Sequence, residues 1–122
     1  MSESGPETAT GVDPEALLRL RTALREQGDA VVAQLIELFI EEAAKRLAII
    51  DEGVRTQDAA SVQACAHALR GSAELLGARR LGYLSARLER AAGDGRLDAA
   101  EALLADLHDE YDRVEGQLKD TA

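Results

Sequence analysis

The chain has 122 residues, a formal net charge of −9 and one cysteine. That length suits a single domain with a buried core, and the acidic balance argues against DNA, RNA and anionic membranes as partners. Three aromatic residues are too few for a platform that stacks bases. One cysteine excludes an intramolecular disulfide. No segment has the pattern of a signal peptide or a membrane span, so we expect a cytoplasmic protein.

The first part of the chain is a polar stretch followed by a short helix. Residues 1–12 are small and polar, and we expect a disordered tail there, followed by a helical bundle domain over residues 13–122. Asp13-Pro14-Glu15 has the pattern of a helix start, with a capping side chain, a first-turn proline and an acid. This helix is expected to end near Gly28, and Asp29 is expected to cap the next one.

The second helix is predicted from apolar residues spaced by three and four positions. These residues are Val32, Leu35, Ile36, Phe39, Ile40, Ala43, Leu47 and Ile50. The break is expected between Gly53 and Gln57, after which Asp58 should cap a third helix that reaches Leu76. Gly77 is expected to take the left-handed conformation that follows many helices.

The last two helices are predicted at about residues 79–92 and from about residue 98 onward. The sequence Gly93-Asp94-Gly95 between them is typical of a turn. Short connections between long amphipathic helices imply antiparallel neighbours. The predicted fold class is therefore all-α, an up-down-up-down antiparallel four-helix bundle with a short extra N-terminal helix as a cover. The evenly polar outer faces favour a monomer.

His67 lies on the third helix and is predicted to face solvent. With about 100° per residue and Leu69 at the centre of the buried face, His67 lies roughly 160° away. A helical histidine is more commonly a hydrogen-bonded core or boundary residue, but this periodicity argues against that interpretation. Arg70 and Gly71 follow at offsets of three and four, so they share its face. An imidazole, a permanent cation and bare backbone suit a nucleophile that handles a phosphoryl group.

Charge is unevenly distributed along the chain. Residues 67–96 contain six arginines and three acids, a balance of +3, whereas the segment from residue 97 onward contains eight acids and two basic residues, a balance of −6. A locally basic region on an acidic protein suits an acidic pocket on a partner. Ordinary solvated helix surface explains it equally well.

The third and fourth helices carry a motif that resembles the histidine-containing phosphotransfer (HPt) domains of bacterial and plant phosphorelays. The motif here is His67-Ala68-Leu69-Arg70-Gly71-Ser72, followed by Leu76-Gly77 and then Leu88-Glu89. The family pattern is roughly His-x-Leu-Lys-Gly-Ser, so an arginine replaces the lysine here. The resemblance covers about residues 14–119.

The resemblance implies a phosphocarrier. His67 would accept a phosphoryl group from the aspartate of a response-regulator receiver domain, or from a hybrid sensor histidine kinase, and pass it to another receiver. The chain would take part stoichiometrically and would not be an enzyme. It would need no cofactor of its own, because the Mg²⁺ for phosphoryl transfer is expected on the receiver. An exposed histidine is mostly in the neutral, nucleophilic form near neutral pH.

The resemblance also implies roles for the residues around His67. Arg70 would attract the phosphoryl oxygens, and Gly71 would let the partner approach the backbone. Glu74 could pair with Arg70, repel an acidic receiver pocket, or be an ordinary exposed acid. The expected partner contacts further include Gln63 and Ala64, and the expected supporting residues are Ser72, by hydrogen bonding, and Gly77.

Two other classes of function remain open. The bundle could dock on a receiver or kinase and inhibit it without accepting phosphate, which predicts binding that survives loss of the imidazole. It could also be an enzyme, for example a phosphatase with His67 as general base and Glu74 as the only carboxylate expected on that face. No cluster has metal-ligand spacing and no glycine-rich loop follows a strand, so neither a metal nor ATP is expected. His108 is not expected in the site.

Overall fold

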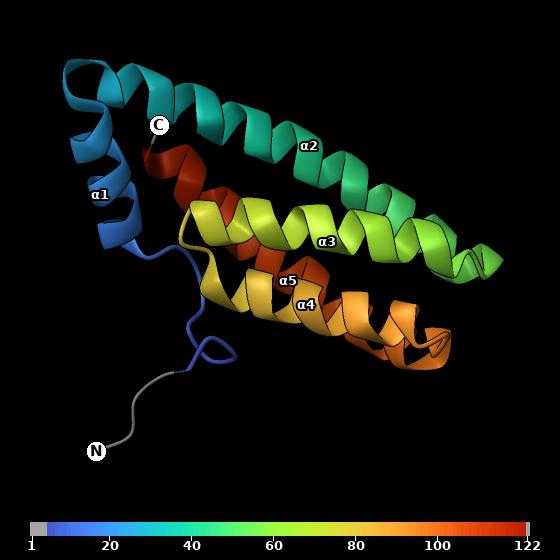
Figure 1. Cartoon of the computed structure of the whole chain (residues 1–122). Coiled ribbons are helices and arrows are strands. Elements are labelled where there is room, and N and C mark those ends of the chain that lie inside the picture. Colours follow the sequence, from blue (N-terminus) through green and yellow to red (C-terminus); the bar gives the residue numbers. More distant parts are fainter. Residues whose placement is uncertain (1–4, 122) are drawn as a thin grey trace.

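The structure, a computed structural model, describes residues 5–121, which form helices joined by short connections (Figure 1). The elements are α1 (Pro14–Leu24), a 3₁₀ turn (Arg25–Gln27), α2 (Gly28–Thr56), α3 (Ala59–Leu75), α4 (Arg79–Gly93) and α5 (Leu97–Thr121). Helices α2 to α5 run alternately up and down, and α1 lies across one end of them (Figure 1). The predicted all-α bundle with an extra N-terminal helix is confirmed.

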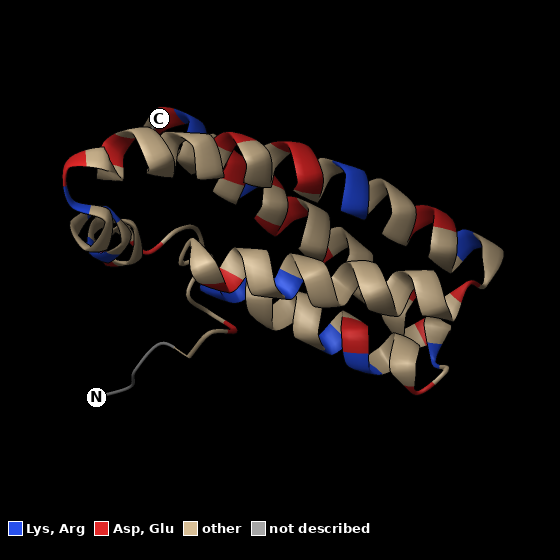
Figure 2. Ribbon diagram, turned by 45° about the horizontal axis from the view of Figure 1, so that its top comes forward, with Lys and Arg blue, Asp and Glu red and all other residues tan. Residues whose placement is uncertain are grey.

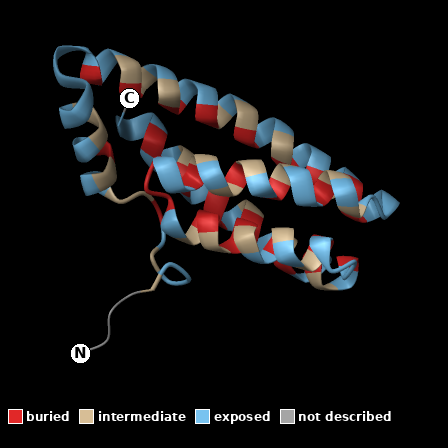
Figure 3. Cartoon of the chain, viewed as in Figure 1, coloured by how far each residue is buried: buried red, intermediate tan, exposed pale blue. Residues whose placement is uncertain are grey.

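The core consists of one apolar stripe from each helix of the bundle, and these stripes face one another (Figure 3). Its largest side chains without appreciable exposure include Ile36, Leu69, Leu88 and Leu107. Of the stripe predicted for α2, Leu35 and Ile40 are only partly buried, and the other members are buried. Because α3 contacts both α2 and α4, its orientation about its own axis is fixed from two sides.

The predicted helix ends are largely found. Asp13 accepts a hydrogen bond from the N–H of Glu15 at 3.0 Å, and Gly77 is left-handed with φ +77°. The start of α2 differs from the prediction. Gly28, rather than Asp29, opens the helix, and it lies so close to the backbone of α1 that a side chain would clash with Arg21. A glycine is therefore required where the chain turns from α1 into α2.

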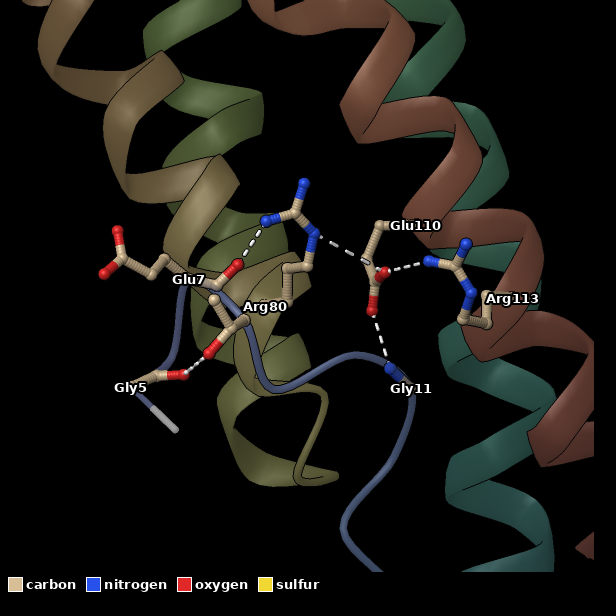
Figure 4. Close-up of polar contacts among 7 residues, drawn as sticks. Gly5, Glu7, Gly11, Arg80, Glu110 and Arg113 are labelled. Atoms are coloured by element: carbon tan, nitrogen blue, oxygen red, sulfur yellow. Dashed lines mark hydrogen bonds and ion pairs between the residues drawn. The ribbon is translucent and has the colours of Figure 1, made fainter. Parts of the chain in front are cut away.

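Residues 5–12 lie against the bundle, which differs from the predicted disordered tail (Figure 4). The N–H of Gly11 donates to Oε2 of Glu110 in α5 at 2.7 Å. At the start of α4, the guanidinium and the N–H of Arg80 both donate to carbonyl oxygens of this segment. The segment thus bridges α4 and α5. Residues 1–4, the rest of the expected tail, lie outside the described residues.

Glu110 is a buried carboxylate, 1% exposed, that the sequence pattern did not single out. Besides the N–H of Gly11, it accepts a hydrogen bond from Arg113, and Nε of Arg80 lies 3.8 Å from its Oε1 (Figure 4). These two hydrogen bonds and the nearby positive charge of Arg80 compensate for the loss of hydration that burial imposes on the carboxylate. Glu110 therefore anchors the N-terminal segment to two helices.

Replacing Glu110 with alanine should lower the free energy of unfolding by about 2 kcal/mol, because the N–H of Gly11 loses its buried acceptor. Urea unfolding followed by circular dichroism measures this. Asp109→Ala is the matched control, since Asp109 is exposed on the same helix. Equal losses in the two variants would contradict an anchoring role for Glu110.

The phenol of Tyr111 links α5 to α2 by donating to the carbonyl of Ile40 at 3.1 Å. Burial, reinforced by the charges of Glu115 and Asp112, raises the pKa of Tyr111 from 10.0 to about 12. The unfolded phenol ionises first, so the stability it contributes is complete below about pH 10 and is lost as pH rises toward 12.

We therefore expect the unfolding free energy of the wild type to fall more steeply over this alkaline range than that of Tyr111→Phe. Urea unfolding at a series of pH values measures both slopes. Tyr83→Phe serves as the control, because Tyr83 is only partly buried. Identical slopes for the wild type and Tyr111→Phe would show that the phenol ionises alike in the folded and unfolded chains.

Candidate functional site

Helix α3 presents His67 to solvent. The imidazole side chain is 63% exposed, as the helical periodicity predicts, while Ala66 and Leu69 on either side of it are fully buried. Asp58 caps the start of the helix, and its carboxylate accepts hydrogen bonds from the N–H and hydroxyl of Ser61. These bonds lower the pKa of Asp58. A capped and well-packed helix thus holds the backbone that carries the imidazole.

Glu89 of α4 orients the imidazole. Its Oε2 lies 2.8 Å from Nδ1 of His67, and its side chain is 21% exposed. A carboxylate is a hydrogen-bond acceptor only, so Nδ1 carries the proton in this contact. The Nε2 atom of the neutral ring then keeps its lone pair. The pair therefore selects one tautomer and leaves Nε2 as the nucleophilic atom.

Arg70 completes the cluster by pairing with the same carboxylate. Its Nη1 lies 3.4 Å from Oε1 of Glu89, and this oxygen is buried without a hydrogen bond among the described residues. The pairing of Arg70 with Glu74 that the sequence allows is not formed. Glu74 is exposed and its side chain lies beside Gly82 of α4, so the interpretation as an ordinary exposed acid fits best. The acid that pairs with Arg70 is therefore Glu89 and not Glu74.

Gly71 leaves the surface beside His67 open. A Cβ atom built on Gly71 would meet no atom within 4 Å, so packing within the chain does not require a glycine at this position. Gln63 and Ala64 are also exposed on α3, and the side chain of Gln63 lies over Gly93 of α4. These residues lie on the flank of α3 that carries His67, and their role as partner contacts stays a prediction.

The two residues assigned a supporting role lie away from the imidazole. Gly77 is buried in the α3–α4 turn, where a side chain would clash with Ala16 of α1. Ser72 is half-buried toward α2, and its hydroxyl makes no hydrogen bond among the described residues, so the expected buttressing of His67 by Ser72 is not found. Helical geometry explains the difference, because Ser72 is five residues from His67 and faces another helix.

An apolar groove of about 170 Å³ lies between α2 and α3. Its rim carries Leu38 and Leu75, which are 54% and 55% exposed. The remaining lining residues are Leu35, Phe39, Glu42, Arg46, Ser72 and Leu76. The apolar periodicity of the sequence does not predict this groove, because Leu38 and Leu75 lie outside the core-facing stripes. Exposed leucines beside a groove are typical of an interaction surface.

The described residues contain no group of three or more His, Cys, Asp or Glu placed to hold a metal ion. Within residues 5–121, no helix combines the length and apolar character needed to cross a membrane. The second histidine, His108, lies on α5, where its Nε2 is 2.9 Å from the carboxylate of Asp51 in α2. It takes no part in the cluster formed by His67, Arg70 and Glu89.

The chain is similar to known proteins in both sequence and structure. The sequence model of a family described as "Hpt domain" matches residues 34–117. A search of curated proteins finds no match. Among solved structures, the chain is similar to histidine-containing phosphotransfer protein B (HptB) from Pseudomonas aeruginosa PAO1, with 24% identity and a TM-score of 0.83 over 93% of this chain and 95% of that chain. At this identity the likeness establishes the fold alone.

Proposed function

Because the chain belongs to the Hpt domain family, we propose that His67 accepts a phosphoryl group from the phosphorylated aspartate of one receiver domain and donates it to another. A hybrid sensor histidine kinase could supply the first of these receivers. The chain acts as a stoichiometric carrier in this proposal. Proteins of this family serve as phosphocarriers in phosphorelays. In this chain, Nε2 of His67 would carry the phosphoryl group.

The hydrogen bond between His67 Nδ1 and Glu89 is the observation that carries the proposal. Nε2 attacks phosphorus, a nitrogen–phosphorus bond forms, and the bond to the receiver's aspartate oxygen breaks. The aspartate leaves as a carboxylate, and the imidazole ring, still protonated on Nδ1, becomes cationic. The carboxylate of Glu89 stabilises that charge. Transfer to a second receiver reverses the same steps.

Arg70 supports the phosphoryl group from the same side. It lies one helical turn from His67, and its ion pair with Glu89 positions its guanidinium. A guanidinium offers several donors that match phosphoryl oxygens. Arg70 therefore offsets the negative charge of the phosphoryl group that is transferred to His67 beside Glu89.

The receiver's docking surface is proposed to include the open flank at Gly71 and the groove between α2 and α3. Gly71 allows the partner to approach the backbone near Nε2. Leu38 and Leu75 offer apolar contacts on the adjoining groove. Burying such side chains against a partner stabilises the complex.

Incubation with a receiver charged by a small phosphodonor tests the proposal. We expect the intact-protein mass of the chain to rise by one phosphoryl group, which acid removes and alkali does not. A second receiver added afterwards should remove the group. A complex that forms without any gain in mass would contradict the carrier and support the alternative, a docking module that inhibits its partner.

Replacing Glu89 with alanine should slow phosphoryl uptake by about 10- to 100-fold, because the imidazole loses the group that fixes its tautomer and stabilises its charge. Single-turnover transfer from the charged receiver measures the rate. Glu89→Gln should retain part of the rate, since an amide oxygen still accepts from Nδ1. Glu74→Ala, a neighbouring exposed acid, should transfer at the rate of the wild type. A Glu89→Ala rate equal to that of Glu74→Ala would remove Glu89 from the mechanism.

A further inference from the structure

Three arginine side chains converge on a groove between α4 and α5. Arg87 and Arg90 come from α4, and Arg96 comes from the connection that follows it. The groove has a volume of about 520 Å³. Its other lining residues are Ala91, Asp94, Ala99, Ala102, Leu103 and Asp106. Helix α4 carries mostly basic charged positions with one acid among them, whereas the charged positions of α5 are mostly acidic (Figure 2).

The three guanidinium groups have no ion-pair partner among the described residues. Elsewhere on the surface, exposed cations such as Lys45, Arg55 and Lys119 pair with acids three or four residues away. The groove contains two acids, Asp94 and Asp106, yet neither lies within 4.0 Å of an arginine nitrogen. The positive charge of the groove is thus left available to a ligand.

The side chains that line the groove leave room for a ligand. The lining contains three small side chains, those of Ala91, Ala99 and Ala102, together with the bulkier Leu103. The guanidinium of Arg87 lies 5.9 Å from the ring centroid of Tyr83, which supports its position on α4. The planar guanidinium groups of arginines that line such a groove are suited to binding carboxylates.

We propose that the groove lined by Arg87, Arg90 and Arg96 binds an acidic segment of a protein partner. The chain as a whole carries a charge of −9, which repels a long polyanion such as DNA, whereas a short carboxylate-rich segment matches the local positive charge. Arg87 lies on the flank of α4 toward α5, and Glu89 lies on the flank toward α3. The groove can therefore be occupied while His67 remains accessible.

Titration of the ¹⁵N-labelled full chain with a short polyglutamate peptide tests the proposal. We expect the arginine side-chain and backbone signals of Arg87, Arg90 and Arg96 to shift, together with those of the α5 residues that line the groove. The triple variant Arg87→Ala, Arg90→Ala, Arg96→Ala should bind about tenfold more weakly, as expected for the loss of three exposed ion pairs. Its phosphoryl uptake should match that of the wild type.

A control variant distinguishes the effect of the charges in the groove on peptide binding from the effect of the total charge of the chain. The triple variant Arg19→Ala, Arg55→Ala, Lys119→Ala also removes three positive charges, but from exposed sites outside the groove. It should bind the peptide within about twofold of the wild type. Equal weakening in both triple variants, shifts centred on His67, or tighter binding of a DNA oligonucleotide than of polyglutamate would overturn the proposal. Phosphoryl uptake on His67 is measured in a separate assay. A failure of the groove to bind the peptide would therefore leave the phosphocarrier proposal intact.

Discussion

His67→Gln should abolish phosphoryl uptake while leaving the fold and the binding of the receiver in place. Glutamine has no nucleophilic nitrogen, so the bond to phosphorus cannot form. The side chain is 63% exposed, and its removal takes nothing from the core. Intact-protein mass after incubation with a charged receiver measures uptake, and circular dichroism measures the fold.

His108→Gln is the matched control for this variant, since His108 is the chain's only other histidine. It pairs with Asp51 on a different pair of helices. We expect this variant to take up one phosphoryl group at the rate of the wild type. Uptake by His67→Gln, or its loss in a well-folded His108→Gln, would assign the phosphoryl group to a residue other than His67.

Gly71→Leu should slow transfer by about 100-fold without destabilising the chain. Gly71 is exposed and a Cβ atom there would meet no atom within 4 Å, so we expect the leucine to obstruct only an approaching receiver. Within a helix, replacing glycine also raises the free energy of unfolding by about 0.5–1 kcal/mol. Slower transfer combined with greater stability is a result that damage to the fold cannot produce.

Gly116→Leu provides the control for this substitution. Gly116 also lies in a helix with open space where its Cβ would be, but on α5. We expect a similar gain in stability and unchanged transfer. Equal transfer by the wild type and Gly71→Leu would mean that receivers do not approach this flank of α3.

Much of the site follows from local sequence, because helical periodicity is a local property. The stripe around Leu69 places it inside and His67 outside, and the motif places Arg70 and Gly71 on the exposed flank. The caps at Asp13 and Asp58 were predictable for the same reason, since each bonds a residue two or three positions later.

The contacts missed from the sequence are those between distant segments. His67 and Glu89 are separated by 22 positions, and they meet only because the α3–α4 turn sets the register of two antiparallel helices. Glu110 is one of eight acids after residue 96, and its contacts with Gly11 and Arg80, which are distant in the sequence, distinguish it from its solvated neighbours. The polar composition of residues 5–12 gave no sign that this segment would lie against α4 and α5.

The position of the phosphoryl group on the imidazole tests the central claim most directly. The chain, labelled with ¹⁵N in its histidines, would be phosphorylated by a charged receiver and studied by NMR in mildly alkaline solution. We predict a ³¹P–¹⁵N coupling at Nε2 of His67, with Nδ1 still protonated toward Glu89. Coupling at Nδ1, coupling at His108, or no phosphohistidine signal would contradict the account.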